Sequence, residues 1–426
     1  MAGAFFWLSA FYFVYCARPE DWVKILAYIP LAKITGILAF VSLLQAAGRT
    51  PRKFKDLPVE AKYLLAMIGL MYAAGFLSPI WKGGAVNHDI DFSKVFVAWV
   101  LTFLLITTLR RLRRIIVIQA GSVAVICFVA ILKGHSLPRL EGVIGGIYSN
   151  PNDLAFAIVL SVPFCLAFLL TAKGIFIKLM WGLGLLVMGA ALFMTASRSG
   201  FIDMAIAGSF CLWHFGVRGK RLYLVVGTLF VSAAMMIAFG NKLQDRFSVI
   251  IGSDVGTKAE LKAYDSYLER KEGMIKAFYG ILHYPILGIG SNNFPVYSGN
   301  WIDVHCAYLQ MGVEEGIPAL ILYLLFFRRG FKNLKAVTKT KNLDPEIKLY
   351  AGALHASLIG FVVGAIFGPE AYQYFSYFAV AYTAVLFAIV KEQQQKSTTA
   401  LAETPKRTSL WETSKTNGTK PTLALR

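Results

Sequence analysis

Residues 291–316 read SNNFPVYSGNWIDVHCAYLQMGVEEG and mark the point where a polar segment passes into an apolar one. His305, Glu314 and Glu315 lie at the start of this apolar segment. An ionisable side chain inside a membrane span, or at its edge, is energetically expensive and usually serves a function. The stretch therefore predicts a membrane span and a candidate site at its beginning.

The composition of the whole chain is that of a membrane protein. Of the 426 residues, 57% are hydrophobic and 16% are charged, and the mean hydropathy is +0.58. We predict an all-α polytopic membrane protein whose residues 1–390 form one transmembrane domain. If each apolar stretch of about 17 to 25 residues is a span, the sequence predicts twelve, of which the first is the weakest: residues 3 to 17, 30 to 47, 61 to 79, 92 to 109, 115 to 132, 154 to 171, 178 to 195, 200 to 217, 222 to 240, 304 to 327, 348 to 368 and 372 to 390.

The distribution of Lys and Arg predicts the orientation of these spans. With the N-terminus inside, the cytoplasmic loops and the tail hold 28 of the 43 basic residues. This excess on one side follows the positive-inside rule. The net charge of +19 is thus explained mostly by the basic residues of the cytoplasmic loops and tail, and no nucleic-acid partner is expected. The run from Arg110 to Arg114 is expected to contact anionic membrane lipids.

Two segments differ from the short connections. Residues 241–302 form a long external loop, in which apolar positions at helical spacing predict a helix from 259 to 281. Long loops of this kind are often functional lids. Residues 391–426 are rich in Lys, Thr and Ser and predict a disordered cytoplasmic tail. The five cysteines are scattered over apolar segments, so neither a disulfide framework nor a cysteine metal site is indicated.

His305 is the candidate proton acceptor, because a neutral imidazole can take a proton from a hydroxyl near physiological pH. A histidine in a span can also serve only as a hydrogen-bond partner between helices. Tyr308, at i+3, is expected on the same helical face. Glu315 lies about three turns deeper, and it is expected to orient a neighbouring helix through a buried hydrogen bond.

Arg198 and Arg270 are the candidate phosphate ligands on the external side, because a guanidinium group binds phosphate in a bidentate manner and stays charged. Arg198 lies in the short turn between two spans, where a structural arginine could also reach the membrane surface. Arg270 lies on the predicted loop helix and could instead pair with Glu269. Arg246 and Lys271 are alternatives for the same role.

Two acidic pairs leave a metal site open as a second possibility. Asp89 and Asp91, in an expected short external loop, are similar to the acidic pairs with which some membrane glycosyltransferases hold a divalent cation. Glu20 and Asp21 form a second such pair. Two acids at this spacing are common by chance, so we predict a site without metal.

The order of several motifs resembles the O-antigen ligase and polymerase superfamily of bacterial envelopes. The matching pieces span about residues 143 to 330. The family usually has an asparagine after the histidine that corresponds to His305, and this chain has Cys306 there. The pieces are the following: YSNPNDLA from Tyr148, TASRSG from Thr195, Arg270 with GMIKA from Gly273, HYPILGIG from His283, and residues 305–316.

This resemblance implies a metal-independent transferase, without cofactor, in the bacterial inner membrane, with its active site facing the periplasm. The donor would be a glycan on undecaprenyl diphosphate, as in lipopolysaccharide and other polysaccharide biosynthesis. His305 would act as the catalytic base, Arg198 and Arg270 would bind the diphosphate, and Tyr308, Glu315 and Asn152 would support them.

The acceptor is left open by the sequence, and it could be a glycan, a lipid or a protein. External positive charge is concentrated in Arg198 and the loop from Lys242 to Lys276, which is enough for one diphosphate and favours a ligase. The alternatives are a polymerase of O-antigen or exopolysaccharide in the same superfamily, and a transporter of lipid-linked glycans.

Overall fold

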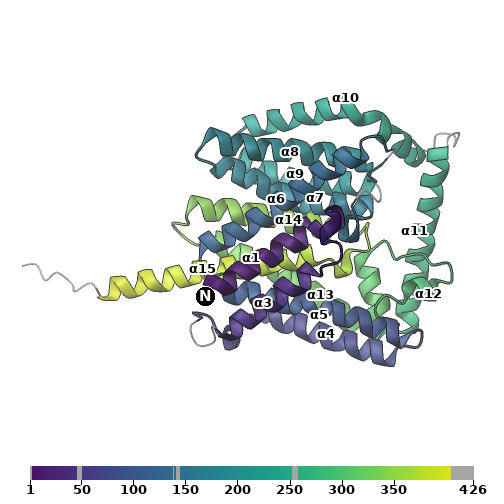
Figure 1. Ribbon diagram of the computed structural model, residues 1–426, viewed down its shortest axis with the longest axis horizontal. Coiled ribbons are helices and arrows are strands. Elements are labelled where there is room, and N and C mark those ends of the chain that lie inside the picture. The colour runs from purple at the N-terminus through teal and green to yellow at the C-terminus, as the bar shows by residue number, and fades with distance from the viewer. Residues whose placement is uncertain (1, 46–49, 138, 141–143, 252–257, 404–426) are drawn as a thin grey trace, which may run out of the picture.

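The computed structural model describes residues 2–45, 50–137, 139–140, 144–251 and 258–403 (Figure 1). These residues form helices and no strand. The long helices are α1 (Ala2–Ala17), α3 (Leu31–Gln45), α4 (Val59–Leu77), α5 (Lys82–Leu105), α6 (Leu109–Gly134), α7 (Pro151–Thr171), α8 (Ile175–Thr195), α9 (Arg198–Cys211), α10 (Tyr223–Ile251), α11 (Lys258–His283), α13 (Ala307–Thr338), α14 (Pro345–Gly364) and α15 (Tyr374–Glu403).

Short elements connect some of these helices. They are α2 (Pro19–Trp22), α12 (Phe294–Ser298), the 3₁₀ helices η1 (Lys24–Leu26), η2 (Phe54–Asp56), η3 (Gly146–Tyr148) and η5 (Glu370–Tyr372), and the π-helix η4 (Leu212–Val217).

Each of the twelve expected spans corresponds to one of the long helices. Within the described residues, eight are long and apolar enough to cross a membrane: α4, α6, α7, α8, α9 with η4, α13, α14 and α15. Helices α1 and α3 have 16 and 15 residues, fewer than a full span needs. The structure thus supports a multi-pass all-α membrane protein, while twelve spans remain a prediction.

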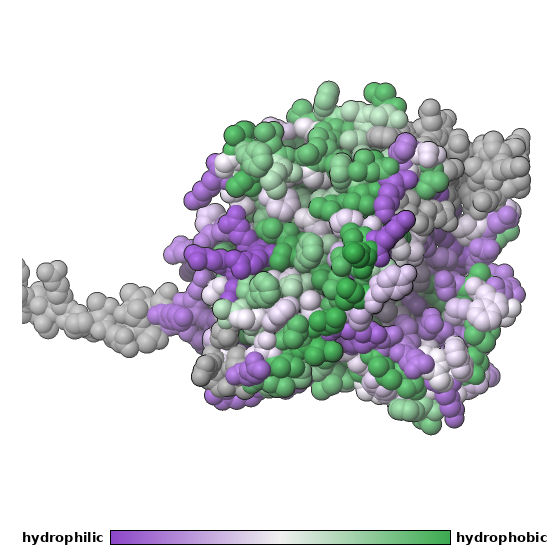
Figure 2. Space-filling model, viewed as in Figure 1, coloured by the Kyte–Doolittle hydropathy of each residue, from purple (hydrophilic) through white to green (hydrophobic). Residues whose placement is uncertain are grey.

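Small residues let the central helices approach one another closely. A Cβ atom at Gly360 of α14 would lie 3.0 Å from Val159 of α7 and 3.1 Å from Ala207 of α9. Close contacts of this kind are typical of helix packing in membranes, where small side chains bring backbones together. The surface has the corresponding pattern, with hydrophobic residues over the middle of the face in Figure 2 and hydrophilic residues toward its left and right ends.

Helix α11 corresponds to the helix predicted in the long loop. In Figure 1 it runs along one side of the molecule, across the ends of the other helices. A Cβ atom at Gly280 of α11 would lie 2.6 Å from Val313 of α13, and one at Gly312 would lie 2.8 Å from Ile281. Helix α11 therefore packs against the first turns of α13, next to the candidate site.

Two boundary predictions are wrong. Helix α5 begins at Lys82 instead of about residue 92, so Asp89 and Asp91 lie in a helix and not in a loop. Helix α15 continues to Glu403, so residues 391–403 of the expected disordered tail are helical. Residues 404–426 of that tail lie outside the described residues.

Candidate active site

Helix α13 is interrupted at Gly316, directly after its two glutamates. Gly316 has φ 81° and ψ 171°, a backbone conformation that glycine adopts readily and other residues do not. A Cβ atom there would lie 2.2 Å from the carbonyl oxygen of Ile286. The glycine therefore permits residues 285–290 to lie directly against the kink.

The kink removes two hydrogen bonds from α13. In a regular helix, the carbonyls of Val313 and Glu314 accept from the N–H groups four residues later. Here the N–H of Ile317 donates to the carbonyl of Pro285 at 2.8 Å. Pro318 has no N–H to donate. The carbonyls of Val313 and Glu314 thus need other partners.

Those partners come from the segment 285–290. The N–H of Ile289 donates to the carbonyl of Val313 at 2.9 Å, and the N–H of Gly290 donates to the carbonyl of Glu314 at 2.8 Å. Buried backbone groups without a partner are costly, so the segment and the kink complete each other. The glycine-rich motif from His283 to Gly290 has a clear structural role, which is to fix the start of α13.

His305 lies at a bend in the irregular segment between α12 and α13. Cys306 is the N-cap residue, and the helix begins at Ala307. The expectation that Tyr308 shares a helical face with His305 is wrong, because His305 precedes the helix. The hydroxyl of Tyr308 donates instead to the carbonyl of Val362 in α14 at 2.7 Å, which anchors the first turn of α13.

Burial and the positive charge of Arg270 lower the pKa of His305 to about 4. The imidazole is therefore neutral at pH 7 and has a nitrogen that can accept a proton. An imidazole with such a low pKa is a weak base. An anion bound to Arg270 would offset the positive charge and raise the pKa of His305 again.

Helix α11 carries Arg270 and is fastened to the segment that holds His305. The ammonium group of Lys276 donates to the carbonyl of Ser298 at 2.6 Å. A Cβ atom at Gly273, one turn after Arg270, would lie 3.0 Å from the carbonyl oxygen of Asp303. These contacts bring the guanidinium of Arg270 close enough to act on the imidazole.

Arg198 is the first residue of α9, and only two residues separate it from the end of α8. Ser197 caps α9, since its hydroxyl accepts from the N–H of Gly200 at 3.2 Å. The same hydroxyl donates to Oδ1 of Asn152 at 2.7 Å. A Cβ atom at Gly200 would lie 2.6 Å from that of Ala155. The first turns of α7 and α9 are therefore side by side, and Arg198 is the first residue of α9.

Three buried or half-buried carboxyl groups near these residues were not proposed as site residues from the sequence. Glu370 of η5 is hydrogen-bonded to Asp153, and Asp203 of α9 is close enough for its charge to act on Glu370. Burial, the charge of Asp153, the hydrogen bond with it and the charge of Asp203 raise the pKa of Glu370 well above its usual range. A titratable residue in the connection between the last two spans is the signal that could have identified Glu370.

Glu315 is fully buried in a network of hydroxyl and carboxyl groups. The hydroxyl of Ser291 contacts Asp89 and Glu315, and the hydroxyl of Tyr372 lies 2.8 Å from both Glu314 and Glu315. Each hydroxyl has one proton to donate, so two hydroxyl protons serve four contacts. Further protons on the carboxyl groups would complete the remaining bonds. The network joins α5, α13 and η5 behind the site.

Asp89 and Asp91 do not form a convergent pair. Asp89 is buried and faces Ser291, whereas Asp91 is exposed and forms an ion pair with Lys94. Residues two apart on a helix point in different directions. The structure therefore does not bring these two carboxylates together to hold a cation.

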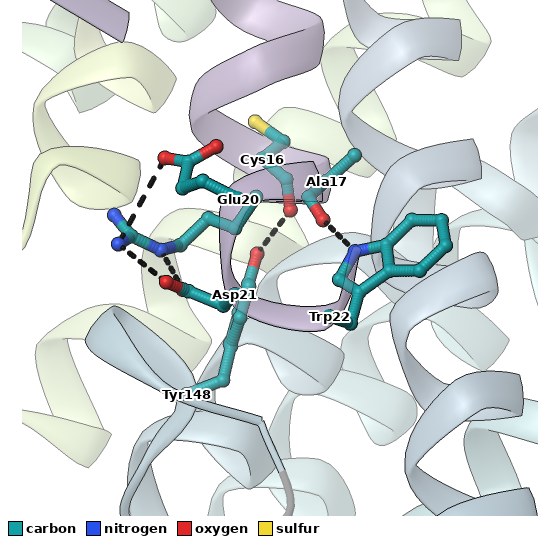
Figure 3. A network of polar contacts seen from close by, with 7 residues as sticks. Cys16, Ala17, Glu20, Asp21, Trp22 and Tyr148 are labelled. Carbon is teal, nitrogen blue, oxygen red and sulfur yellow. Dashed lines mark hydrogen bonds and ion pairs between the residues drawn. The ribbon is translucent and has the colours of Figure 1, made fainter. Parts of the chain in front are cut away.

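The second acidic pair is engaged by an arginine (Figure 3). Arg18 forms ion pairs with Glu20 and Asp21. Beside them, the hydroxyl of Tyr148 donates to the carbonyl of Cys16 at 2.7 Å. Tyr148 begins the motif that leads into α7, so this cluster connects the end of α1 with the start of that motif.

Lys271 and Arg246 were the alternatives to Arg270 as a phosphate ligand, and the structure describes the side chain of Lys271 only. Lys271 is exposed on α11, next to the half-buried Arg270. Arg246 lies in α10, where the described structure does not include its side chain.

Comparison with protein families gives a match to part of the chain. Residues 183–324 match the model of the family described as O-antigen ligase. The match contains Arg198, Arg270 and His305, and it confirms the resemblance to the O-antigen ligase and polymerase superfamily. No curated protein matches the chain.

Proposed function

Because residues 183–324 carry the O-antigen ligase match, we propose that the protein transfers a glycan from undecaprenyl diphosphate to an acceptor hydroxyl on the outer face of the inner membrane, as an O-antigen ligase. The family supports ligase or polymerase activity in general. The observation that supports the proposed chemistry, which a ligase and a polymerase would share, is the half-buried His305 beside the charge of Arg270.

In the proposed reaction, the acceptor oxygen attacks the anomeric carbon of the donor glycan. The bond between that carbon and the diphosphate oxygen breaks, and its electron pair leaves with undecaprenyl diphosphate. His305 takes the proton of the acceptor hydroxyl. Arg198 and Arg270 stabilise the negative charge that develops on the leaving diphosphate.

The remaining residues hold this arrangement. Asn152 holds the cap of α9 and so fixes Arg198. Tyr308 anchors α13 to α14, and Glu315 is part of the hydrogen-bonded network behind the kink. Binding of the anionic donor at Arg270 would also strengthen His305 as a base, which couples donor binding to proton transfer.

The test uses the purified protein with a labelled lipid-linked glycan of defined length and candidate acceptors. A ligase gives one product, larger than the acceptor by one donor glycan, and releases undecaprenyl diphosphate. His305→Ala should reduce this rate about 10²- to 10⁴-fold, while the exposed His135→Ala serves as a control. Near wild-type turnover by His305→Ala would eliminate the proposed base.

The same assay separates the alternatives. A ladder of products made from the donor alone would identify a polymerase. A label that crosses the membrane without a new covalent product would identify a transporter. Addition of EDTA should leave the rate unchanged, and a loss that Mg²⁺ or Mn²⁺ restores would contradict the proposed metal independence.

A further inference from the structure

A cavity lies at the opposite end of α9 and α13 from Arg198 and His305. Its volume is about 720 Å³, which is within the usual range of ligand pockets. It lies between the end of α9 with η4, the end of α13 and the start of α14. The positive-inside rule places these helix ends on the cytoplasmic side, whereas Arg198 and His305 lie at the other ends of α9 and α13.

The lining of this cavity is strongly basic. Four cationic side chains contribute to it, and no acidic residue is among the described residues that line it. The cations are Arg218, Arg221, Lys335 and Lys348.

The two carboxylates that flank the lining residue Pro345 in the chain have other partners. Glu346 forms an ion pair with Arg113 at 3.4 Å and accepts from Tyr350 at 2.6 Å. Asp344 caps α14, since its side chain accepts from the N–H of Glu346 at 2.7 Å. The positive charge that faces the cavity is therefore not balanced by a lining carboxylate.

The π-helix η4 brings part of this charge together. The N–H of Arg218 donates to the carbonyl of Trp213 at 2.9 Å, and the N–H of Arg221 donates to that of Gly216 at 2.7 Å, so both bonds span five residues. Short π-helical turns inside or beside α-helices are frequent at functional sites. This turn carries Arg218 and Arg221 to the same cavity.

A pair of histidines forms another part of the wall. Nε2 of His214 lies 3.2 Å from Nδ1 of His355, and the two rings share a hydrogen bond. His355 belongs to α14. A Cβ atom at Gly352 of the same helix would lie 3.1 Å from the ring of Phe215. Helix α14 and η4 are thus closely packed, and the cavity has a defined wall.

The surroundings of the cavity are those of a membrane interface. Phe215, Phe331, Leu334 and Leu349 supply apolar lining. Trp213 and Tyr223 beside it are half or more exposed, and the guanidinium of Arg218 lies 5.7 Å from the ring of Trp213. Aromatic residues in this arrangement are typical of the level of lipid headgroups.

We propose that this cavity binds the phosphate headgroup of an anionic phospholipid from the cytoplasmic leaflet. The cations would hold the phosphate oxygens, while the apolar wall and the exposed aromatic residues would contact the start of the acyl chains. Basic pockets between transmembrane helices on the cytoplasmic side commonly bind such headgroups. This site is separate from the proposed donor site.

The test compares the full-length protein in phosphatidylcholine nanodiscs with and without cardiolipin. Native mass spectrometry measures the cardiolipin retained, and thermal unfolding measures the stabilisation. The variant Arg221→Gln/Lys335→Gln/Lys348→Gln removes cavity charge, and Lys332→Gln/Lys339→Gln/Lys341→Gln removes the same charge from exposed positions on the same side that do not line the cavity.

The wild type and the control should retain cardiolipin, and the cavity variant should lose it by about 5-fold for each removed cation. Equal retention by the cavity variant, or an equal loss in the control, would overturn the proposal. So would equal stabilisation by inorganic phosphate in phosphatidylcholine nanodiscs, because this would identify a site for a soluble anion. If the triple variant fails to fold, the exposed single change Lys348→Gln gives the same comparison with Lys341→Gln.

Discussion

The hydroxyl of Ser197 donates a hydrogen bond to Oδ1 of Asn152 over 2.7 Å. Ser197 is the residue before Arg198, and it also caps α9. Asn152 lies in the first turn of α7, 45 residues earlier in the chain. One bond thus fixes the position of a proposed diphosphate ligand relative to a different helix.

Asn152→Ala should lower kcat/KM for glycan transfer about 5-fold, because a neutral hydrogen bond of about 1 kcal/mol is lost. Asn152→Asp keeps the acceptor oxygen and should retain more activity than Asn152→Ala. The exposed Asn87→Ala serves as a control. Equal activity of Asn152→Ala and wild type would show that the bond does not position Arg198.

Arg198→Lys and Arg270→Lys should each lower kcat/KM about 10- to 100-fold, because lysine keeps the charge but not the bidentate fork. The measurement is the transfer rate at several donor concentrations. Lys271→Gln, an exposed neighbour of Arg270, should leave the rate unchanged. Normal rates in both lysine variants would mean that the arginines act only through their charge or have a structural role.

The pH dependence of the reaction should reflect the lowered pKa of His305. The pKa of about 4 lies below the usual value for histidine, so the imidazole stays neutral as the pH falls from 7 to about 5. We expect kcat/KM, which reports the free enzyme, to fall only near pH 4. The acid limb of the kcat profile should lie at higher pH, because the bound diphosphate offsets the positive charge of Arg270 and so raises the pKa of His305. An acid limb of kcat/KM near the ordinary histidine pKa would contradict this assignment.

Glu370→Gln should stabilise the protein more at high pH than at low pH. The pKa of Glu370 is raised in the folded state, so the unfolded chain releases its proton first as the pH rises above the ordinary glutamate range. Stability contributed by the protonated Glu370 is then lost progressively as the pH rises. The melting temperatures of both proteins at acidic and alkaline pH provide the test. A constant difference between them would exclude the raised pKa.

Gly316→Ala should destabilise the protein by about 2 kcal/mol or more, because a positive φ is strained for alanine and the added Cβ meets the carbonyl of Ile286. Thermal unfolding measures the loss. Gly182→Ala is the matched control, since no atom lies within 4 Å of its added Cβ. If Gly316→Ala melted like the control, the kink would not depend on glycine.

The sequence by itself determined the class of the fold and most of the helices. Apolar stretches long enough to span a membrane can form only helices or closed barrels there, and the helical spacing between residues 259 and 281 was sufficient to predict α11. The chemistry of His305, Arg198 and Arg270 could be proposed from residue type and from the orientation that the distribution of basic residues predicts, which puts all three on one side of the membrane.

Only the tertiary structure decided how these residues meet. The start of α5 at Lys82 could not be seen from hydropathy, because Asp89 is buried through a contact with Ser291, about 200 residues later. The roles of Gly316 and of the segment 285–290 depend on backbone hydrogen bonds between them. Glu370 joins the site through Asp153. Contacts between residues distant in the chain leave no periodic pattern in the sequence, so the fold must bring them together before they can be recognised.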